Sequence, residues 1–144
     1  MCAVCLRLEQ ADVRYVVVSG TAVVLHGFDR PLGDLDIVIS SEPGGVERAM
    51  RELALSGFVP SIPLPMSLVS VMRMFDANQR EIDVFVRYAV PFEELWTHSE
   101  SRALAEGTIR IISREHLLRV KRLGGRPHDL EDIQALLASG ERPQ

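Results

Sequence analysis

Three aspartates, Asp34, Asp36 and Asp83, are the residues whose type and spacing point most directly to chemistry. Asp34 and Asp36 stand at the head of an apolar run, residues 35–39, that predicts a buried β-strand. Side chains two positions apart on a strand point to the same face, so these two carboxylates converge. Adjacent carboxylates repel one another unless a cation lies between them, and magnesium prefers such oxygen ligands. The pair therefore predicts a magnesium site, although two water-facing acids at a strand entry are an alternative that this spacing leaves open.

Asp83 lies in a second acidic strand, which alternating apolar side chains predict over residues 80–87. It shares one face of that strand with Glu81. If the two acidic strands pair, Asp83 joins Asp34 and Asp36 in one carboxylate cluster. Such a cluster can hold two metal ions about 3.5–4 Å apart, an arrangement suited to in-line phosphoryl transfer. The alternative is an exposed acid of a hairpin, a description that fits Glu81 better than Asp83.

A turn of small residues, Ser19-Gly20-Thr21, precedes the first acidic strand and is a candidate anion site. It joins a β-branched run at 14–18, which predicts a strand, to a short helix predicted over 22–27. Glycine lets backbone N–H groups approach a phosphate, and a helix N-terminus adds a favourable dipole. A tight strand-to-helix turn without any ligand is the commoner explanation of such residues.

The elements that must position these residues follow from apolar periodicity and from turn residues. We expect helices over 3–11, 43–56, from 91 onward, over 113–123 and over 128–138, and a further short strand over 108–112. Residues 68–75 and 80–87 predict a hairpin, while residues 28–33 and 59–67 predict irregular segments. Strands that alternate with helices, together with one hairpin, predict an α/β (α+β) domain with a mixed β-sheet flanked by helices. Its C-terminal helical element is expected over about residues 113–139.

The composition suits one domain over residues 1–144. The chain has 144 residues, 47% of them hydrophobic, which is enough for a single core. Its 16 basic and 20 acidic residues give a net charge of −4, so no sequence-wide field attracts nucleic acid, although basic residues gather between 110 and 126. No apolar run reaches the roughly 20 residues of a membrane span, and the N-terminus lacks a secretory leader. We therefore expect a cytoplasmic protein without a membrane partner.

In combination, the small-residue turn, the D-x-D strand and the later strand aspartate resemble the DNA polymerase β-like nucleotidyltransferase superfamily. In that superfamily an hG[GS] turn is followed by DhD and then by an aspartate on a later strand. The sequence is most similar to small bacterial nucleotidyltransferases related to the AbiEii-type toxins of toxin–antitoxin systems. Residues 15–27 resemble their first motif, and residues 121–132 resemble their C-terminal lysine and GRP-x-D turn. Ser19 replaces a frequent glycine, and Leu32 replaces a frequent threonine or serine.

The resemblance implies a nucleotidyltransferase fold and a role for each motif. Asp34 and Asp36 would coordinate two magnesium ions, for which manganese is a substitute, and Asp83 would hold the catalytic ion and help to activate the acceptor hydroxyl. The nucleoside triphosphate would be contacted by Ser19, Gly20, Thr21, Arg30, Lys121 and Arg126. For the basic residues a second interpretation stays open. Arg30 can pair with a neighbouring aspartate, and Lys121 and Arg126 can lie on a solvated basic helix face with Asp129 and Asp132 pairing nearby.

The implied activity is transfer of a nucleoside monophosphate, from ATP or another triphosphate, to a hydroxyl of a protein, an RNA or a small molecule. Pyrophosphate would be released, and a cognate antitoxin or toxin protein would be a partner. A non-catalytic nucleotide-binding or antitoxin-like module of the same fold is the alternative, against which the intact set of three acids argues. A phosphohydrolase with a carboxylate-bound metal pair is a third candidate, but the sequence lacks the histidines that such sites often use.

Overall fold

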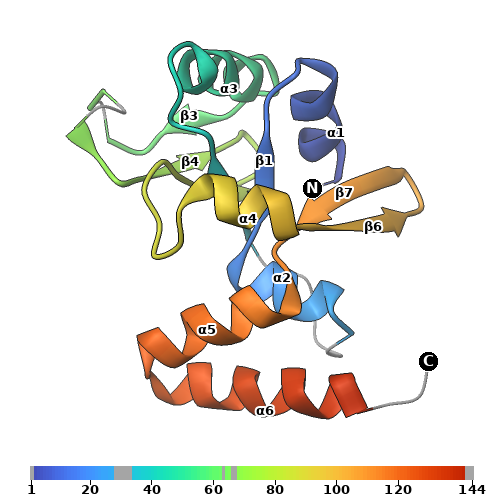
Figure 1. The fold of residues 1–144 in the computed structure, drawn as a ribbon. Coiled ribbons are helices and arrows are strands. Elements are labelled where there is room, and N and C mark those ends of the chain that lie inside the picture. The colour runs from blue at the N-terminus through green and yellow to red at the C-terminus, as the bar shows by residue number, and fades with distance from the viewer. Residues whose placement is uncertain (1, 28–33, 63, 66–67, 142–144) are drawn as a thin grey trace.

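A mixed β-sheet flanked by helices forms the centre of the chain (Figure 1). The structure is a computed structural model that describes residues 2–27, 34–62, 64–65 and 68–141. The strands in these residues are β1 (Tyr15–Val17), β2 (Leu35–Ile39), β3 (Val59–Pro60), β4 (Val71–Phe75), β5 (Glu81–Phe85), β6 (Glu100–Leu104) and β7 (Gly107–Ile111). The helices are α1 (Cys2–Gln10), α2 (Ser19–Leu25), α3 (Gly45–Leu55), α4 (Phe92–His98), α5 (Arg114–Gly124) and α6 (Pro127–Glu141). The strands follow the order β3-β4-β5-β2-β1-β7-β6 across the sheet.

The two acidic strands are neighbours in this sheet. β2 pairs with β5 in parallel, with Asp36 opposite Asp83, and pairs with β1 on its other side in antiparallel orientation. β4 continues the sheet antiparallel to β5, which places Arg73 opposite Asp83. The strand pairing on which the position of Asp83 depended is therefore confirmed, and the sheet is mixed because it contains both kinds of pair.

Side-chain alternation gives each face of the sheet its own core. The core beside α1 and α3 includes Leu8, Leu35, Ile37 and Leu53. The core beside α2, α4 and α5 includes Val23, Val38, Leu95 and Leu117. Successive strand residues point to opposite faces, so Asp36 lies on the second face, with Val38. β1 contributes to both cores, which explains why its sequence is apolar without alternation.

The C-terminal helices α5 and α6 form a hairpin that encloses a buried ion-pair cluster. Lys121 Nζ lies 3.4 Å from Asp129 Oδ1 and 3.0 Å from Asp132 Oδ2, and all three side chains are buried. Gly125 follows α5 with a φ of 64°, the left-handed conformation that glycine adopts most easily. A Cβ on Gly124 would overlap the Asp129 carboxylate, so this close approach requires glycine. The turn sequence is thus explained by packing inside the hairpin.

Three predicted segments differ from the structure. The small-residue turn Ser19-Gly20-Thr21 forms the first turn of α2 (Ser19–Leu25), so this helix begins three residues earlier than predicted. Residues 100–104, for which no element was expected, form β6 and pair with β7 as a hairpin at the sheet edge. Only Ala103 and Leu104 of its residues are apolar, and neither is buried, so this edge strand has no apolar pattern to detect. Val59–Pro60, expected to be irregular, forms the opposite edge strand β3. The predicted loop 28–33, with Arg30 and Leu32, lies outside the described residues. Within the described ranges, no helix is both long enough and apolar enough to cross a membrane.

Candidate active site

Four carboxylates gather where β2 and β5 begin. Asp36 lies opposite Asp83, and Asp34, which directly precedes β2, hydrogen-bonds with Glu81. The side chains of Asp83 and Glu81 are only 16% and 17% exposed. The structure therefore brings Asp34, Asp36 and Asp83 together, as the sequence predicted. It also adds Glu81, whose sequence position had fitted an exposed hairpin acid better, and we call these four residues the acidic cluster.

Burial and mutual repulsion perturb the acidic cluster. Burial, followed by the charges of Asp83 and Asp34, raises the pKa of Asp36 to about 7, and a hydrogen bond with Asp83 acts in the same direction. Burial and the charge of Asp34 likewise raise the pKa of Glu81, against the opposing charge of Arg73. The cluster therefore carries negative charge that its surroundings neutralise only in part.

Arg73 is a charged contact of this cluster that the sequence did not predict. Its Nε lies 3.0 Å from Asp83 Oδ1, and its Nη2 lies 3.4 Å from Asp83 Oδ2. The hydrogen bonds and charge of Asp83, followed by the charge of Glu81, raise the pKa of Arg73. In the sequence, Arg73 can be noticed as the one charged residue of the apolar segment 71–75. Its partner could not be read from the sequence, because that depends on the register of the hairpin.

The acidic cluster suits a divalent cation by its chemistry. It presents only carboxylate oxygens, the ligands that magnesium prefers, on two adjacent strands. Burial and the charge of Asp83 raise the pKa of Asp36, and a dication held by the two carboxylates would favour loss of that proton. Among the residues that the structure describes, no three His, Cys, Asp or Glu side chains are arranged as ligands of one ion. Asp83 instead directs both oxygens to Arg73.

The small-residue turn is tied to the backbone of the acidic strand. The Val18 N–H donates to the Asp36 carbonyl at 2.9 Å, and Thr21 Oγ1 donates to the Asp34 carbonyl at 2.8 Å. Thr21 is buried, so its hydroxyl positions Asp34 in this structure. Ser19 has a φ of 60°, a conformation that a glycine would adopt with less strain. The turn and the acids therefore lie side by side.

Tyr88 connects this turn to the acidic cluster, although no pattern in the sequence pointed to this residue. Burial raises the pKa of its phenol to about 12, against a hydrogen bond with Ser19 that lowers it, and the charges of Asp36 and Asp129 raise it further. Its ring packs edge-on against Phe85, with 5.4 Å between the centroids. Tyr88 thus lies within electrostatic range of the turn, the acidic strand and the C-terminal hairpin.

Lys121 and Arg126, two predicted phosphate contacts, both pair with Asp129. Arg126 Nε lies 3.0 Å from Asp129 Oδ2, and Lys121 is buried beside the same carboxylate. Burial alone would raise the pKa of Asp129, but hydrogen bonds from Arg126 and the charge of Lys121 lower it to about 2. The pairing with nearby aspartates agrees with the second interpretation, but the predicted solvated helix face is wrong for Lys121, because the packing of α6 on α5 buries this side chain.

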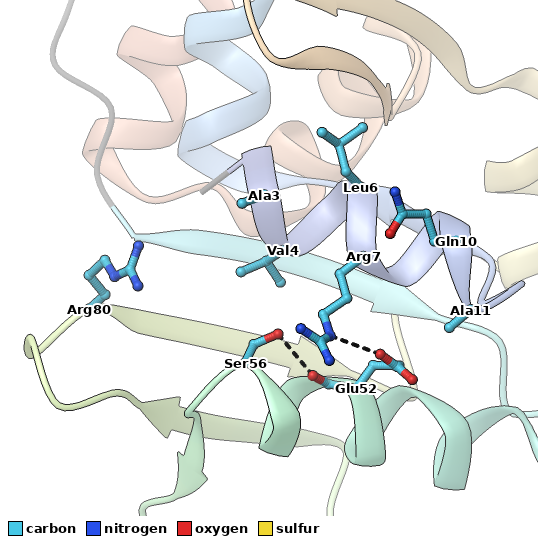
Figure 2. A pocket seen from close by; sticks show the side chains of 9 residues that line it. All are labelled: Ala3, Val4, Leu6, Arg7, Gln10, Ala11, Glu52, Ser56 and Arg80. Carbon is cyan, nitrogen blue, oxygen red and sulfur yellow. Dashed lines mark hydrogen bonds and ion pairs between the residues drawn. The ribbon is translucent and has the colours of Figure 1, made fainter.

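Two hollows lie near the beginning of the acidic strands. A cavity of ≈ 80 Å³ is lined by Asp34, Glu81 and Arg80 among others. Figure 2 shows a larger hollow of ≈ 650 Å³ between α1 and α3, where Arg7 Nε and Glu52 Oε2 form an ion pair of 2.9 Å. Because α1 and α3 cover the other face of the sheet, this larger hollow does not adjoin the face that carries Asp36.

No model of a protein family matches the sequence, and no curated protein matches it either. Solved structures, however, share its fold. The lincosamide antibiotic adenylyltransferase LnuA, bound to lincomycin, is 19% identical with a TM-score of 0.64, over 92% of this chain and 90% of LnuA. TM1012 from Thermotoga maritima, a proposed nucleotidyltransferase, is 16% identical with a TM-score of 0.67, over 98% and 91%. ANT(2")-Ia in complex with adenylyl-2"-tobramycin is 13% identical with a TM-score of 0.65, over 94% and 84%.

These likenesses establish the fold class. The chain has the nucleotidyltransferase fold, a mixed sheet flanked by helices, and the predicted fold class is confirmed. Its structural neighbours are nucleotidyltransferases that include antibiotic adenylyltransferases.

Proposed function

We propose that this protein is a magnesium-dependent nucleotidyltransferase that transfers a nucleoside monophosphate from a triphosphate to a hydroxyl acceptor. The observation that carries the proposal is the register of β2 and β5, which places Asp36 opposite Asp83 with Asp34 beside them. Support also comes from the fold, which the chain shares with adenylyltransferases.

In this proposal Asp34, Asp36 and Asp83 hold the divalent ions, magnesium or manganese. When bound, the ions would neutralise charge on the triphosphate and lower the pKa of the acceptor hydroxyl. Asp36 must lose its proton to act as a ligand, and the positive charge of the ions favours that loss. Asp83, on the neighbouring strand, is the proposed proton acceptor beside the reacting hydroxyl.

Ser19 and Gly20 are the proposed phosphate contacts, because the hydrogen bonds from the Val18 N–H and the Thr21 hydroxyl hold their turn next to the acidic strand. Thr21 supports them indirectly, since its hydroxyl is bonded to the Asp34 carbonyl. Arg30 is proposed as a further contact from the sequence alone. To contact a phosphate, Lys121 and Arg126 would have to leave the Asp129 carboxylate. We therefore propose a smaller role for them in nucleotide binding.

A small molecule is the acceptor that the neighbours favour. LnuA, a lincosamide antibiotic adenylyltransferase, is described with bound lincomycin, and ANT(2")-Ia with adenylyl-2"-tobramycin, which carries an adenylyl group. A protein or RNA hydroxyl is the other acceptor class. The resemblance of residues 15–27 and 121–132 to AbiEii-type relatives is the reason to include a toxin–antitoxin setting, in which a cognate protein would control the activity.

A non-catalytic nucleotide-binding or antitoxin-like module is the second candidate. The observation that favours it is the ion pair between Arg73 and Asp83, which engages one of the three proposed metal ligands. Both candidates predict binding of a nucleoside triphosphate. They differ in turnover, because only the enzyme transfers a nucleoside monophosphate to an acceptor.

The test uses purified protein, magnesium and each of the four triphosphates labelled at the α-phosphorus. Acceptors are aminoglycoside and lincosamide antibiotics, tRNA, a lysate protein mixture and the protein itself. We expect label transfer by the wild type and its loss in Asp36→Asn and Asp83→Asn, by at least about a hundredfold. Glu93→Gln, an exposed acid on α4, is the matched control and should retain activity. Transfer that persists in both aspartate variants would contradict the proposal, and nucleotide binding without transfer would favour the module.

A further inference from the structure

Arg73 contacts both carboxylates that β5 contributes to the acidic cluster. Its Nε lies 3.0 Å from Asp83 Oδ1 and 3.4 Å from Glu81 Oε2, and its Nη2 lies 3.4 Å from Asp83 Oδ2. Two N–H groups of one planar guanidinium therefore donate to the two oxygens of one carboxylate, a geometry that lysine cannot reproduce. The cross-strand register of β4 and β5 places the two residues opposite each other.

A second arginine, Arg80, lies near the same acids but has a different partner. It lines the small cavity with Asp34 and Glu81, whereas its Nε pairs with Asp76 Oδ2 at 2.6 Å. The side chains of Arg73 and Arg80 are both 56% exposed. The chain thus offers two equally exposed cations close to the acidic cluster, and in the described residues it is Arg73 that pairs with Asp83.

We propose that Arg73 competes with the divalent metal ion for Asp83, so that its guanidinium leaves this carboxylate when an ion binds. The inference rests on the proposed function, because it takes Asp83 to be a metal ligand. A dication on the Asp83 oxygens would lie beside the guanidinium charge, and like charges at that separation repel one another even in a partly solvated site. The ion pair therefore lowers the affinity of the metal-free protein for the ion.

If Arg73 instead helps the ion to bind, its removal should change the metal affinity in the opposite direction. If the guanidinium served to orient Asp83 toward the ion, its removal would leave that side chain less ordered and would weaken metal binding. The direction of the change in affinity therefore distinguishes competition from orientation. Because Arg73 is more than half exposed, neither role requires it for folding.

The experiment measures manganese binding without nucleotide, from the signal of free Mn²⁺ in electron paramagnetic resonance. We expect Arg73→Gln to bind Mn²⁺ about threefold to tenfold more tightly than the wild type, since a competing, solvent-screened cation has been removed. Arg73→Lys keeps the charge without the bidentate geometry and should give an intermediate affinity. Arg80→Gln is the matched control, because it removes the same charge near the cluster without touching Asp83, and it should change the affinity less.

A second readout follows the arginine itself. In protein with ¹⁵N-labelled arginine, the Nε–H signal of Arg73, assigned with Arg73→Lys, should shift as Mg²⁺ is added, while that of Arg80 should not. Equal or weaker Mn²⁺ binding by Arg73→Gln overturns the competition, as does an equal gain in Arg80→Gln. Absence of Mn²⁺ binding in the wild type and in Arg73→Gln overturns the proposed function together with this inference, so the two failures are distinguishable.

Discussion

Asp36 and Asp83 lie opposite each other on parallel strands β2 and β5, and burial, followed by the charge of Asp83, raises the pKa of Asp36 to about 7. A carboxyl group with such a pKa is partly protonated near neutral pH in the absence of metal. This links the charge of the acidic cluster to its stability and to its affinity for a cation.

The contribution of Asp36 to the stability of the metal-free protein should fall as the pH rises. The pKa of Asp36 is raised from 3.8 to about 7, so the folded state binds this proton more tightly than the unfolded state does. The stabilisation is fully present below about pH 4 and is lost as the pH rises through about 7.

In EDTA, we expect the Tm of the wild type to fall relative to that of Asp36→Asn between these pH values, as thermal unfolding can measure. Added magnesium near pH 8 should raise the Tm of the wild type and not that of Asp36→Asn. A constant Tm difference across this range would contradict the protonated state.

Tyr88→Phe should weaken nucleotide binding without disturbing the fold. The substitution keeps the ring that packs on Phe85 and removes the hydroxyl that hydrogen-bonds with Ser19. We expect the free energy of unfolding to fall by about 1 kcal/mol or less. If Ser19 contacts the triphosphate, the KM for the triphosphate should rise about threefold to tenfold while kcat changes less. A loss confined to kcat would instead place the hydroxyl at the reacting atoms.

Gly124→Ala should destabilise the C-terminal hairpin. The added methyl group would overlap the Asp129 carboxylate, and overpacking of this kind costs about 1–3 kcal/mol. Gly125→Asn is the matched control, because its Cβ would meet open space and asparagine tolerates a left-handed conformation. Urea unfolding should give a lower midpoint for Gly124→Ala than for Gly125→Asn, and the reverse order would count against the described packing.

Lys121→Met should be among the more destabilising single substitutions of this chain. It would leave Asp129 and Asp132, both buried, without the ammonium group between them, and removal of one member of a buried ion pair costs about 3 kcal/mol or more. Lys121→Met combined with Asp132→Asn should recover part of the loss, because the buried carboxylate charge that lies 3.0 Å from the ammonium group is removed as well. Arg119→Gln, which breaks an exposed pair with Glu94, should have little effect by the same unfolding measurement.

The acidic strands could be predicted because each is an apolar segment interrupted by acid. Whether these two strands pair could not be predicted, since the whole sheet sets a parallel register and the two strands alone do not. Arg73 and Glu81 were missed for that reason, although both are visible as charged residues in strands. Their significance depends on the cross-strand neighbours that the register provides.

Buried polar contacts are the other structural feature that could not be predicted from the sequence. Lys121 and Arg126 were considered both as phosphate contacts and as partners of nearby aspartates, and only the packing of α5 on α6 shows that Lys121 is buried. Strand β6 escaped prediction because an edge strand that is solvated on one side needs no apolar run. Tyr88 follows β5 in a segment without a repeating pattern, so its contact with Ser19 depends on tertiary structure alone.

The hydrogen bonds between the small-residue turn and the acidic strand have a practical consequence. They run to the backbone carbonyls of Asp34 and Asp36, not to the carboxylates. Exchange of an acidic side chain for its amide therefore leaves the turn in place. In a test of the proposed transfer, a loss of activity in Asp36→Asn can therefore be assigned to the missing carboxylate charge rather than to displacement of the turn.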